Sequence, residues 1–237
     1  MTFRYFAIVF ESEGGRELKF IRVAILLAVA TLIGGCSDMG DVGKNAETQT
    51  EIPETIAVQD EYTRSFLVST DEVSEGHYAF RPWTEAYTMW IPVNATLDSV
   101  FYEKREKHWE RFLYAWVEKD KNISYGVYGF FEDRPDSEEY GLIHLADYAQ
   151  YEGEFERFEE EENIYYYGKS ISEVGEKGEE EIPVYSNIGF VKHKKSGKSL
   201  GILHDHRCSD WTTNCNADTE RIEKHFWELV KSVRFED

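Results

Sequence analysis

Positive charge is scarce in this sequence. Its 237 residues include 26 lysines and arginines against 46 aspartates and glutamates, which gives a formal net charge of −20 at pH 7. A surface of this sign repels nucleic acid, so we expect no DNA or RNA partner. Apolar residues are plentiful by contrast: 41% of the chain is hydrophobic and 15% aromatic, enough to fill the core of one sizeable domain.

The most apolar run of the chain, Val23 to Ile33, is too short to span a bilayer comfortably. Small residues follow it, and three basic residues precede it: Arg16, Lys19 and Arg22. This order of a positive, an apolar and a small-residue region is typical of a secretory signal peptide. The segment Leu32-Ile33-Gly34-Gly35-Cys36 resembles the lipobox of bacterial lipoproteins.

The resemblance implies that Cys36 is diacylated on sulfur and becomes the mature N-terminus. Residues 1–35 would then be a signal peptide, residues 36–62 a lipidated start with a flexible polar tether, and residues 63–237 a single folded domain. The implied location is the outer, extracytoplasmic side of the cell membrane, where the acyl chains anchor the protein.

Cysteine is rare, with only three in the chain. Beyond Cys36 there remain Cys208 and Cys215, a pair in a chain that the signal-peptide pattern predicts to be exported to an oxidising compartment. A disulfide between them would close a short loop and contribute about 2.5 kcal/mol in the chain-entropy model. Two free or metal-bound thiols are the alternative.

Strand patterns dominate the folded part. Alternating aromatic residues predict strands over 87–91 and 109–117, and the latter places Phe112, Tyr114 and Trp116 on one face. A Lys-Asp-Lys-Asn turn predicts a hairpin with residues 123–131. Further strands are expected at 164–171, 184–193 and 200–206, the last two forming a hairpin.

Two helices are predicted. The Glu-rich stretch 137–162 carries apolar residues at wider spacing and predicts a middle helix with a break at Gly153. The C-terminal helix has Asn216 or Asp218 as its N-cap, Glu220 in its first turn and Lys231 near its end. Its apolar stripe would dock on a sheet, and it comprises Ile222, Phe226, Leu229, Val230 and Val233.

The predicted fold class is α+β: a mostly antiparallel sheet with a middle helix and a C-terminal helix packed on it. The order of elements, and above all the closing segment 226–235, resembles the PsbP-like group of small α+β domains. That resemblance implies an adaptor or binding module that lacks catalytic machinery, and it transfers no functional residue.

Familiar catalytic motifs are missing. The sequence has no Gly-x-Ser-x-Gly elbow and no His-Glu-x-x-His zinc pair, and Gly189 is too far from Gly197 for a phosphate-binding loop. We therefore predict no cofactor.

The best local candidate for chemistry is a histidine pair. His204 and His206 would project from one side of a strand and reach a zinc- or copper-type ion, with His193 as a third ligand if the hairpin register allows. Because Leu200 and Ile202 share that side, ordinary packed imidazoles are the alternative.

Two surface features have competing interpretations. The first is a lysine cluster at a hairpin tip, which comprises Lys192, Lys194, Lys195 and Lys198. It either orients the domain toward anionic lipid or wall polymer, or it keeps the strand edges from pairing with other chains. The tryptophans either build the core or line a groove for sugars or peptides; two in one concavity would favour the groove. The candidates are Trp83, Trp90, Trp109 and Trp116.

The sequence thus predicts a membrane-anchored envelope lipoprotein that acts as a binding or adaptor module for an unknown envelope protein or ligand. A metal-dependent or otherwise unrecognised hydrolase is the alternative function. Convergence of titratable groups in a pocket would distinguish the two.

Overall fold

The structure is a computed structural model that describes residues 53–175, 182–210, 212–213, 215 and 217–236. The predicted signal peptide, Cys36 and most of the predicted tether lie outside the described residues. Everything described belongs to one compact unit, residues 51–237.

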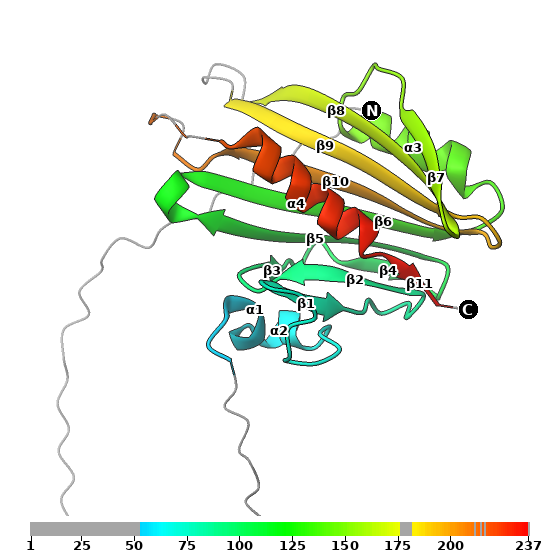
Figure 1. Ribbon diagram of the computed structural model, residues 1–237, viewed down its shortest axis with the longest axis horizontal. Coiled ribbons are helices and arrows are strands. Elements are labelled where there is room, and N and C mark those ends of the chain that lie inside the picture. The colour runs from blue at the N-terminus through cyan, green and yellow to red at the C-terminus, as the bar shows by residue number, and fades with distance from the viewer. Residues whose placement is uncertain (1–52, 176–181, 211, 214, 216, 237) are drawn as a thin grey trace, which may run out of the picture. The chain divides into compact units, whose positions relative to one another are not determined.

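A large antiparallel sheet has the strand order β3-β5-β6-β10-β9-β8-β7, with β4 also paired to β5 (Figure 1). Its strands are β3 (Thr96–Leu97), β4 (Glu103–Arg105), β5 (Trp109–Glu118), β6 (Ile123–Asp133), β7 (Glu156–Glu160), β8 (Asn163–Val174), β9 (Ile182–His193) and β10 (Lys198–Cys208). The four central strands are each ten residues or longer. Short turns join β5 to β6 and β9 to β10, so each of these pairs is antiparallel, whereas β6 and β10 pair although they are distant in the sequence.

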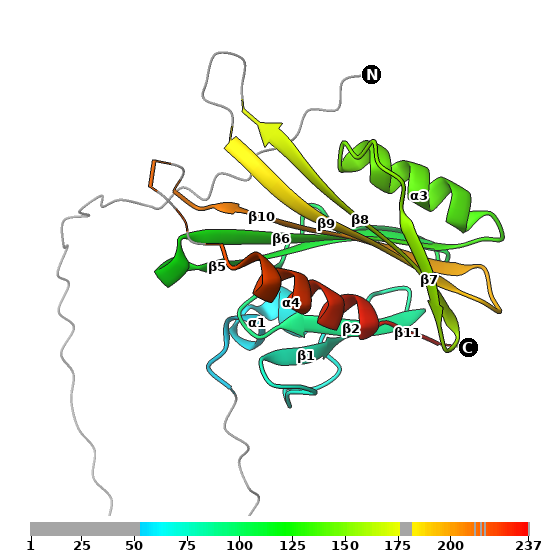
Figure 2. The same cartoon turned by 45° about the horizontal axis from the view of Figure 1, so that its top comes forward.

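A second, smaller sheet has the order β1-β2-β11, built from β1 (His77–Phe80), β2 (Tyr87–Pro92) and β11 (Arg234–Phe235). The helices are α1 (Ile56–Gln59), α2 (Glu61–Arg64), α3 (Ser137–Tyr148) and α4 (Thr219–Lys231), with a 3-10 turn η1 (Lys119–Lys121). Figure 2 shows α3 on one side of the large sheet, and α4 with the small sheet on the other. Sheet therefore dominates an α+β arrangement, as predicted, but the prediction of one sheet did not include the second, smaller one.

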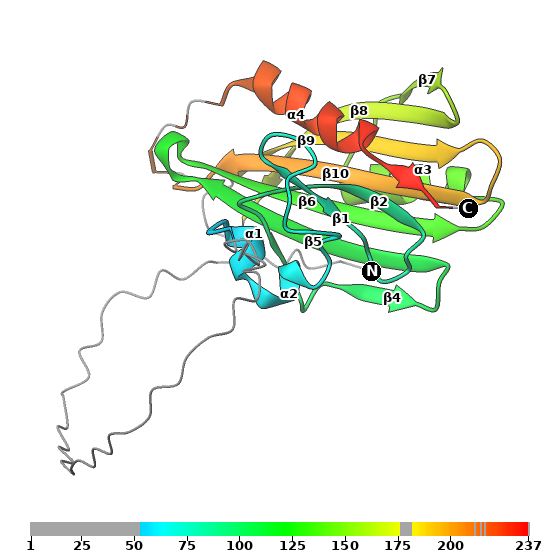
Figure 3. The ribbon, with the colours of Figure 1, turned by 60° about the horizontal axis from the view of Figure 1, so that its bottom comes forward.

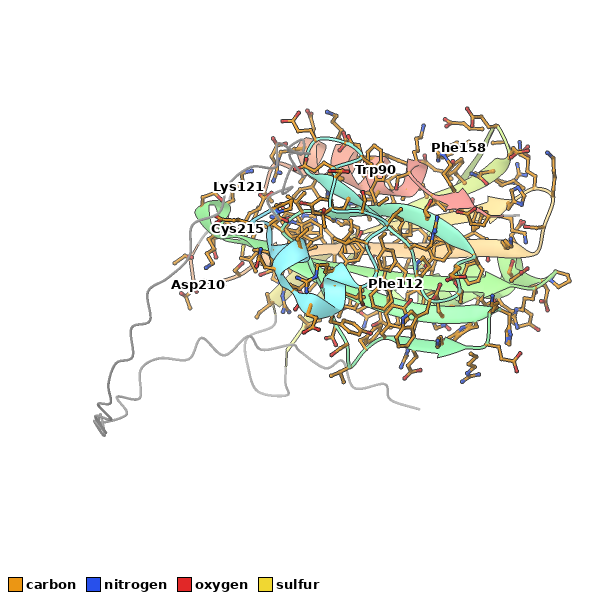
Figure 4. The ribbon with its side chains drawn as sticks, turned by 90° about the horizontal axis from the view of Figure 1, so that it is seen from below. Trp90, Phe112, Lys121, Phe158, Asp210 and Cys215 are labelled. Carbon is orange, nitrogen blue, oxygen red and sulfur yellow. A yellow bond between two sulfur atoms is a disulfide. The ribbon has the colours of Figure 1, made fainter. Side chains whose placement is uncertain are left out.

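The main core lies between the large sheet, the small sheet and α4. The ring of Phe80 on β1 lies 5.2 Å from that of Phe112 on β5, and Tyr87 on β2 lies 5.1 Å from Phe131 on β6. Figure 3 shows the small sheet across the β5 and β6 end of the large one, and Figure 4 places Phe112 in the interior. The predicted stripe of α4 is buried here in full.

The opposite face of the large sheet has its own, smaller core beneath α3. Leu145 of α3 is fully buried there against aromatic and aliphatic residues of β6, β8, β9 and β10. Ile143 and Tyr140 of the same helix remain more than half exposed.

The hairpin of β5 and β6 confirms the prediction from alternating aromatics. Phe112, Tyr114 and Trp116 all lie on the buried face of β5. Phe112 stands opposite Gly129 on β6, where an added Cβ would come within 2.0 Å of the Phe112 ring. Glycine is required at this position because the ring occupies the space of a side chain.

The middle helix is shorter than predicted. It ends at Tyr148, and residues 156–160 form β7, which pairs with β8. As a strand, the segment places Phe158 on Tyr165 of β8 at 5.2 Å and on Trp227 of α4 at 5.5 Å. Pairing with a strand edge and these ring contacts override the weak helical pattern of a Glu-rich segment.

The remaining boundaries follow local signals. Asp218 is the N-cap of α4, and its side chain accepts a hydrogen bond from the backbone N–H of Arg221 at 3.1 Å. At the start of the described chain, Ala57 and Val58 of α1 are fully buried in the main core. The folded domain therefore includes residues that the sequence pattern placed in the tether.

Candidate functional site

A groove with a volume of about 800 Å³ runs along α4, which we call the α4 groove. Its floor is the outer face of the small sheet, and α4 and the end of β7 supply its walls. The lining residues are Val73, Ala79, Thr88, Met89, Trp90, Phe158, Glu160, Lys224, Trp227, Glu228, Lys231, Ser232 and Arg234. The volume falls in the range of small-molecule sites in proteins.

Two half-buried tryptophans, Trp90 and Trp227, line this groove. Trp90 is on the outward side of β2, because its neighbours Met89 and Ile91 point into the core. Trp227 packs against Tyr167 of β8, with ring centroids 4.9 Å apart, and also against Phe158. Figure 4 shows Trp90 and Phe158 close to α4. The Trp227 indole is thus held by packing, and both indoles keep part of their surface open.

Charged side chains surround the aromatic surface. Lys231 of α4 is paired with Glu160 of β7 at 2.9 Å, and Lys224 with Glu228 at 3.6 Å. Arg234 is exposed, and its Nη1 donates to the backbone carbonyls of Lys231 at 2.6 Å and Val233 at 2.8 Å. Within the part of the chain that the structure describes, no carboxylate pairs with Arg234.

The histidines of the sequence analysis lie on the other, inner side of α4. His204 and His206 project from the same face of β10, as predicted, and both are buried. His204 packs between Trp116 and Phe226, at centroid distances of 5.7 and 6.2 Å, while His206 stacks on Tyr185 at 5.3 Å. Their ring nitrogens have no hydrogen-bond partner among the described residues.

Two further histidines, which the sequence analysis missed, extend the pair into a row. His225 of α4 lies 5.6 Å from His204, ring to ring, and its Nε2 lies 3.1 Å from Nε2 of His77 on β1. Nδ1 of His77 is 3.0 Å from the Glu75 carbonyl and donates to it, so its Nε2 accepts from His225. We call His77, His225, His204 and His206 the histidine row.

Burial keeps most of this row uncharged. It lowers the pKa of His225, where His77 adds to the effect, and that of His206, in each case from 6.5 to about 4. The pKa of His204 is also lowered well below its usual range, first by burial and then by His225 and His206.

The suggested third metal ligand is elsewhere. His204 stands opposite Asn187 on β9, so His193 is six residues further along the strand, roughly 20 Å away at the usual strand rise. Its Nδ1 bonds Ser196 Oγ at 2.7 Å instead. Within the described ranges, no three His, Cys, Asp or Glu side chains are placed to hold a metal ion.

The lysine cluster at the β9–β10 turn is engaged within the chain. Lys192 is buried and donates to Ser137 Oγ of α3 at 3.0 Å, and Lys194 contacts Glu159 at 3.1 Å. Lys195 contacts Glu162, and Lys198 donates to the backbone carbonyl of Glu236. These contacts fasten the turn to β7, α3 and the C-terminal segment.

The predicted disulfide joins Cys208 and Cys215, with Cα atoms 5.4 Å apart. The loop it closes is held against the turn after η1, where Asn122 accepts from the Asp210 backbone N–H at 2.8 Å and donates to Thr213. Figure 4 shows Cys215 and Asp210 at this end of the domain.

The tryptophans divide between the two predicted uses. Trp116 is in the core, stacked on Tyr125 at 4.7 Å, whereas Trp90 shares one concavity with Trp227. Trp83 is half exposed and lies outside the groove. Trp227 was missed because it follows Phe226 directly and so lies at the border of the apolar stripe.

The comparisons with known proteins place the chain in a lipoprotein family. It belongs to the family described as "Putative lipoprotein YvcA", whose sequence model matches residues 53–234. The protein of that description from Bacillus subtilis (strain 168) is 25% identical over an alignment 238 residues long. The alignment covers 93% of this chain and 97% of the relative. No solved structure matches the chain.

Among the helices in the described part of the chain, none is long and apolar enough to cross a bilayer.

Proposed function

We propose that this protein is a non-catalytic binding module of the cell envelope, held at the outer side of the membrane by lipid on Cys36, and that the α4 groove binds saccharide. The observation that carries the proposal is the presence of Trp90 and Trp227 in one groove of about 800 Å³. Family membership and the lipobox-like sequence support the anchor and its location.

Sugar rings suit this groove because they have apolar C–H faces and polar edges. The indole rings offer flat apolar surfaces, and the surrounding lysines, glutamates and Arg234 offer donors and acceptors for hydroxyl groups. The aromatic surface is fixed before a ligand arrives, since Trp227 packs on Phe158 and Tyr167. Such preorganisation reduces the entropic cost of binding.

The test is a titration of the full-length protein, purified in mild detergent, with glycan fragments solubilised from bacterial cell walls. Tryptophan fluorescence or calorimetry reports binding. We expect Trp227→Ala to weaken binding roughly tenfold, which corresponds to the loss of about 1.4 kcal/mol of stacking. Trp227→Phe keeps an aromatic packing partner for Tyr167 and should lose less.

Trp83→Ala is the matched control, because Trp83 is half exposed outside the groove. Equal weakening by the Trp83 and Trp227 variants, or no binding by the wild type, would contradict the proposal. The recovered glycan should be unchanged in mass. Cleaved fragments would instead favour the hydrolase interpretation.

A further inference from the structure

We infer that the saccharide bound in the α4 groove carries a carboxylate, and that Arg234 recognises it. This inference rests on the proposed function and adds the charge of the ligand to it. Its starting point is the contrast between a chain of net charge −20 and a groove lined by three cations and two carboxylates, Glu160 and Glu228.

The two carboxylates of the groove are already neutralised. Lys231 holds Glu160 at 2.9 Å across the gap between α4 and β7, and Lys224 holds Glu228 on the same helix at 3.6 Å. The third cation, Arg234, has no such partner among the described residues. One positive charge of the lining is therefore uncompensated, which matches a ligand with one negative charge.

Arg234 is also positioned before a ligand arrives. Its Nη1 is fixed by the carbonyls of Lys231 and Val233, at 2.6 and 2.8 Å, where α4 ends and β11 begins. Its Nε and Nη2 make no hydrogen bond with the described residues and form the side of the guanidinium that binds a carboxylate through two parallel bonds. The guanidinium is exposed, so a ligand reaches it without a rearrangement of the core.

The location of Arg234 links this charge to the aromatic surface. β11 pairs with β2 so that Arg234 stands opposite Thr88, two residues before Trp90 on the same face of the strand. All three residues line the groove. A sugar stacked on an indole can therefore direct a carboxylate substituent toward the guanidinium.

The experiment titrates the full-length protein with three probes: a disaccharide that contains N-acetylmuramic acid, which bears a carboxylate; the uncharged N,N′-diacetylchitobiose; and glycerol 3-phosphate. We expect the carboxylated disaccharide to bind at least tenfold more tightly than the uncharged one. Arg234→Gln should remove that preference, because it should weaken binding of the carboxylated disaccharide far more than binding of the uncharged one. Arg234→Lys keeps the positive charge but lacks the two parallel N–H donors, so it should retain only part of the preference for the carboxylated disaccharide.

Arg105→Gln is the control, since Arg105 is an exposed cation on β4 outside the groove. Equal affinity for both disaccharides would overturn the carboxylate inference and leave the saccharide proposal standing. Tighter binding of glycerol 3-phosphate would overturn it in favour of a phosphate ligand. A third outcome is that neither disaccharide binds, although Trp227→Ala still weakens binding of cell-wall fragments. This result would reject the carboxylated saccharide as the ligand but keep the α4 groove as the binding site.

Discussion

Acidification is expected to destabilise the domain through the histidine row, and the substitution His206→Gln isolates the effect. Burial lowers the pKa of His206 to about 4 in the folded protein, against 6.5 for an exposed imidazole. Between these values the unfolded chain binds a proton that the folded chain does not. Stability from this group is therefore fully present above about pH 6.5, and it falls as the pH decreases toward about 4.

The magnitude follows from the difference in pKa. A pKa difference of about 2.5 between the unfolded and folded states corresponds to a loss of about 3.4 kcal/mol of stability for one imidazole at the acid limit. Between pH 6.5 and 4.5 the loss is about 2 kcal/mol. Around pH 5 the unfolding free energy should therefore depend less steeply on pH in His206→Gln than in the wild type. The two slopes should differ by close to one proton, which is about 1.4 kcal/mol per pH unit.

The buried carboxyl groups do not disturb this comparison. Burial raises the pKa of Asp205 to about 7, and it also raises the pKa of Glu110, so both carboxyls contribute with the opposite sign. They are present in both proteins and cancel from the difference between the two slopes. The effect of His225→Gln should be similar, because burial and His77 lower its pKa to the same value.

The assay is urea unfolding followed by tryptophan fluorescence, at a series of pH values from about 4.5 to about 7. His108→Gln serves as the control, since it also replaces one histidine by glutamine but at a side chain that is 57% exposed. A slope identical in the wild type and His206→Gln would refute the conclusion that His206 is buried uncharged.

Three further predictions concern covalent chemistry and packing. Cys36→Ala should abolish incorporation of radiolabelled palmitate and leave unprocessed precursor; label on the variant would contradict the lipid anchor. Cys208 and Cys215 should resist alkylation until reduced, and their replacement should cost about 2.5 kcal/mol of stability; thiols that react in the native exported protein would contradict the disulfide. Gly129→Ala should lower the free energy of unfolding in urea by about 1–3 kcal/mol, because its Cβ would overlap the Phe112 ring. Gly126→Ala, with its nearest contact at 3.6 Å, should lower it less. Equal losses of stability in the two variants would contradict the packing described for Gly129.

Local signals in the sequence predicted much of the fold. Alternating aromatics identified β5, the strands predicted at 184–193 and 200–206 identified the hairpin of β9 and β10, and the choice of Asn216 or Asp218 as N-cap located the start of α4. In each case neighbouring residues carry the information, so no knowledge of distant partners was needed. β7 was missed because its strand character depends on pairing with β8 and on the contact of Phe158 with Trp227.

The candidate site was much less predictable. Trp90 is placed beside α4 partly by the bond of its backbone N–H to Ser232 Oγ, across 142 residues of sequence, and the bond of His77 to His225 spans 148. Such contacts leave no local periodicity. His204 and His206 were recognised as a pair because they share one strand, whereas the other half of the histidine row comes from β1 and α4.

The most direct test of the α4 groove as the binding site is hydrogen–deuterium exchange of the full-length protein, with and without the N-acetylmuramic acid disaccharide. Binding there should slow exchange in β2, in β11 and in the last two turns of α4, and leave α3 unchanged. Slowed exchange confined to α3 and the sheet face that it covers, or to the Cys208–Cys215 loop, would place the ligand elsewhere and contradict the proposed function.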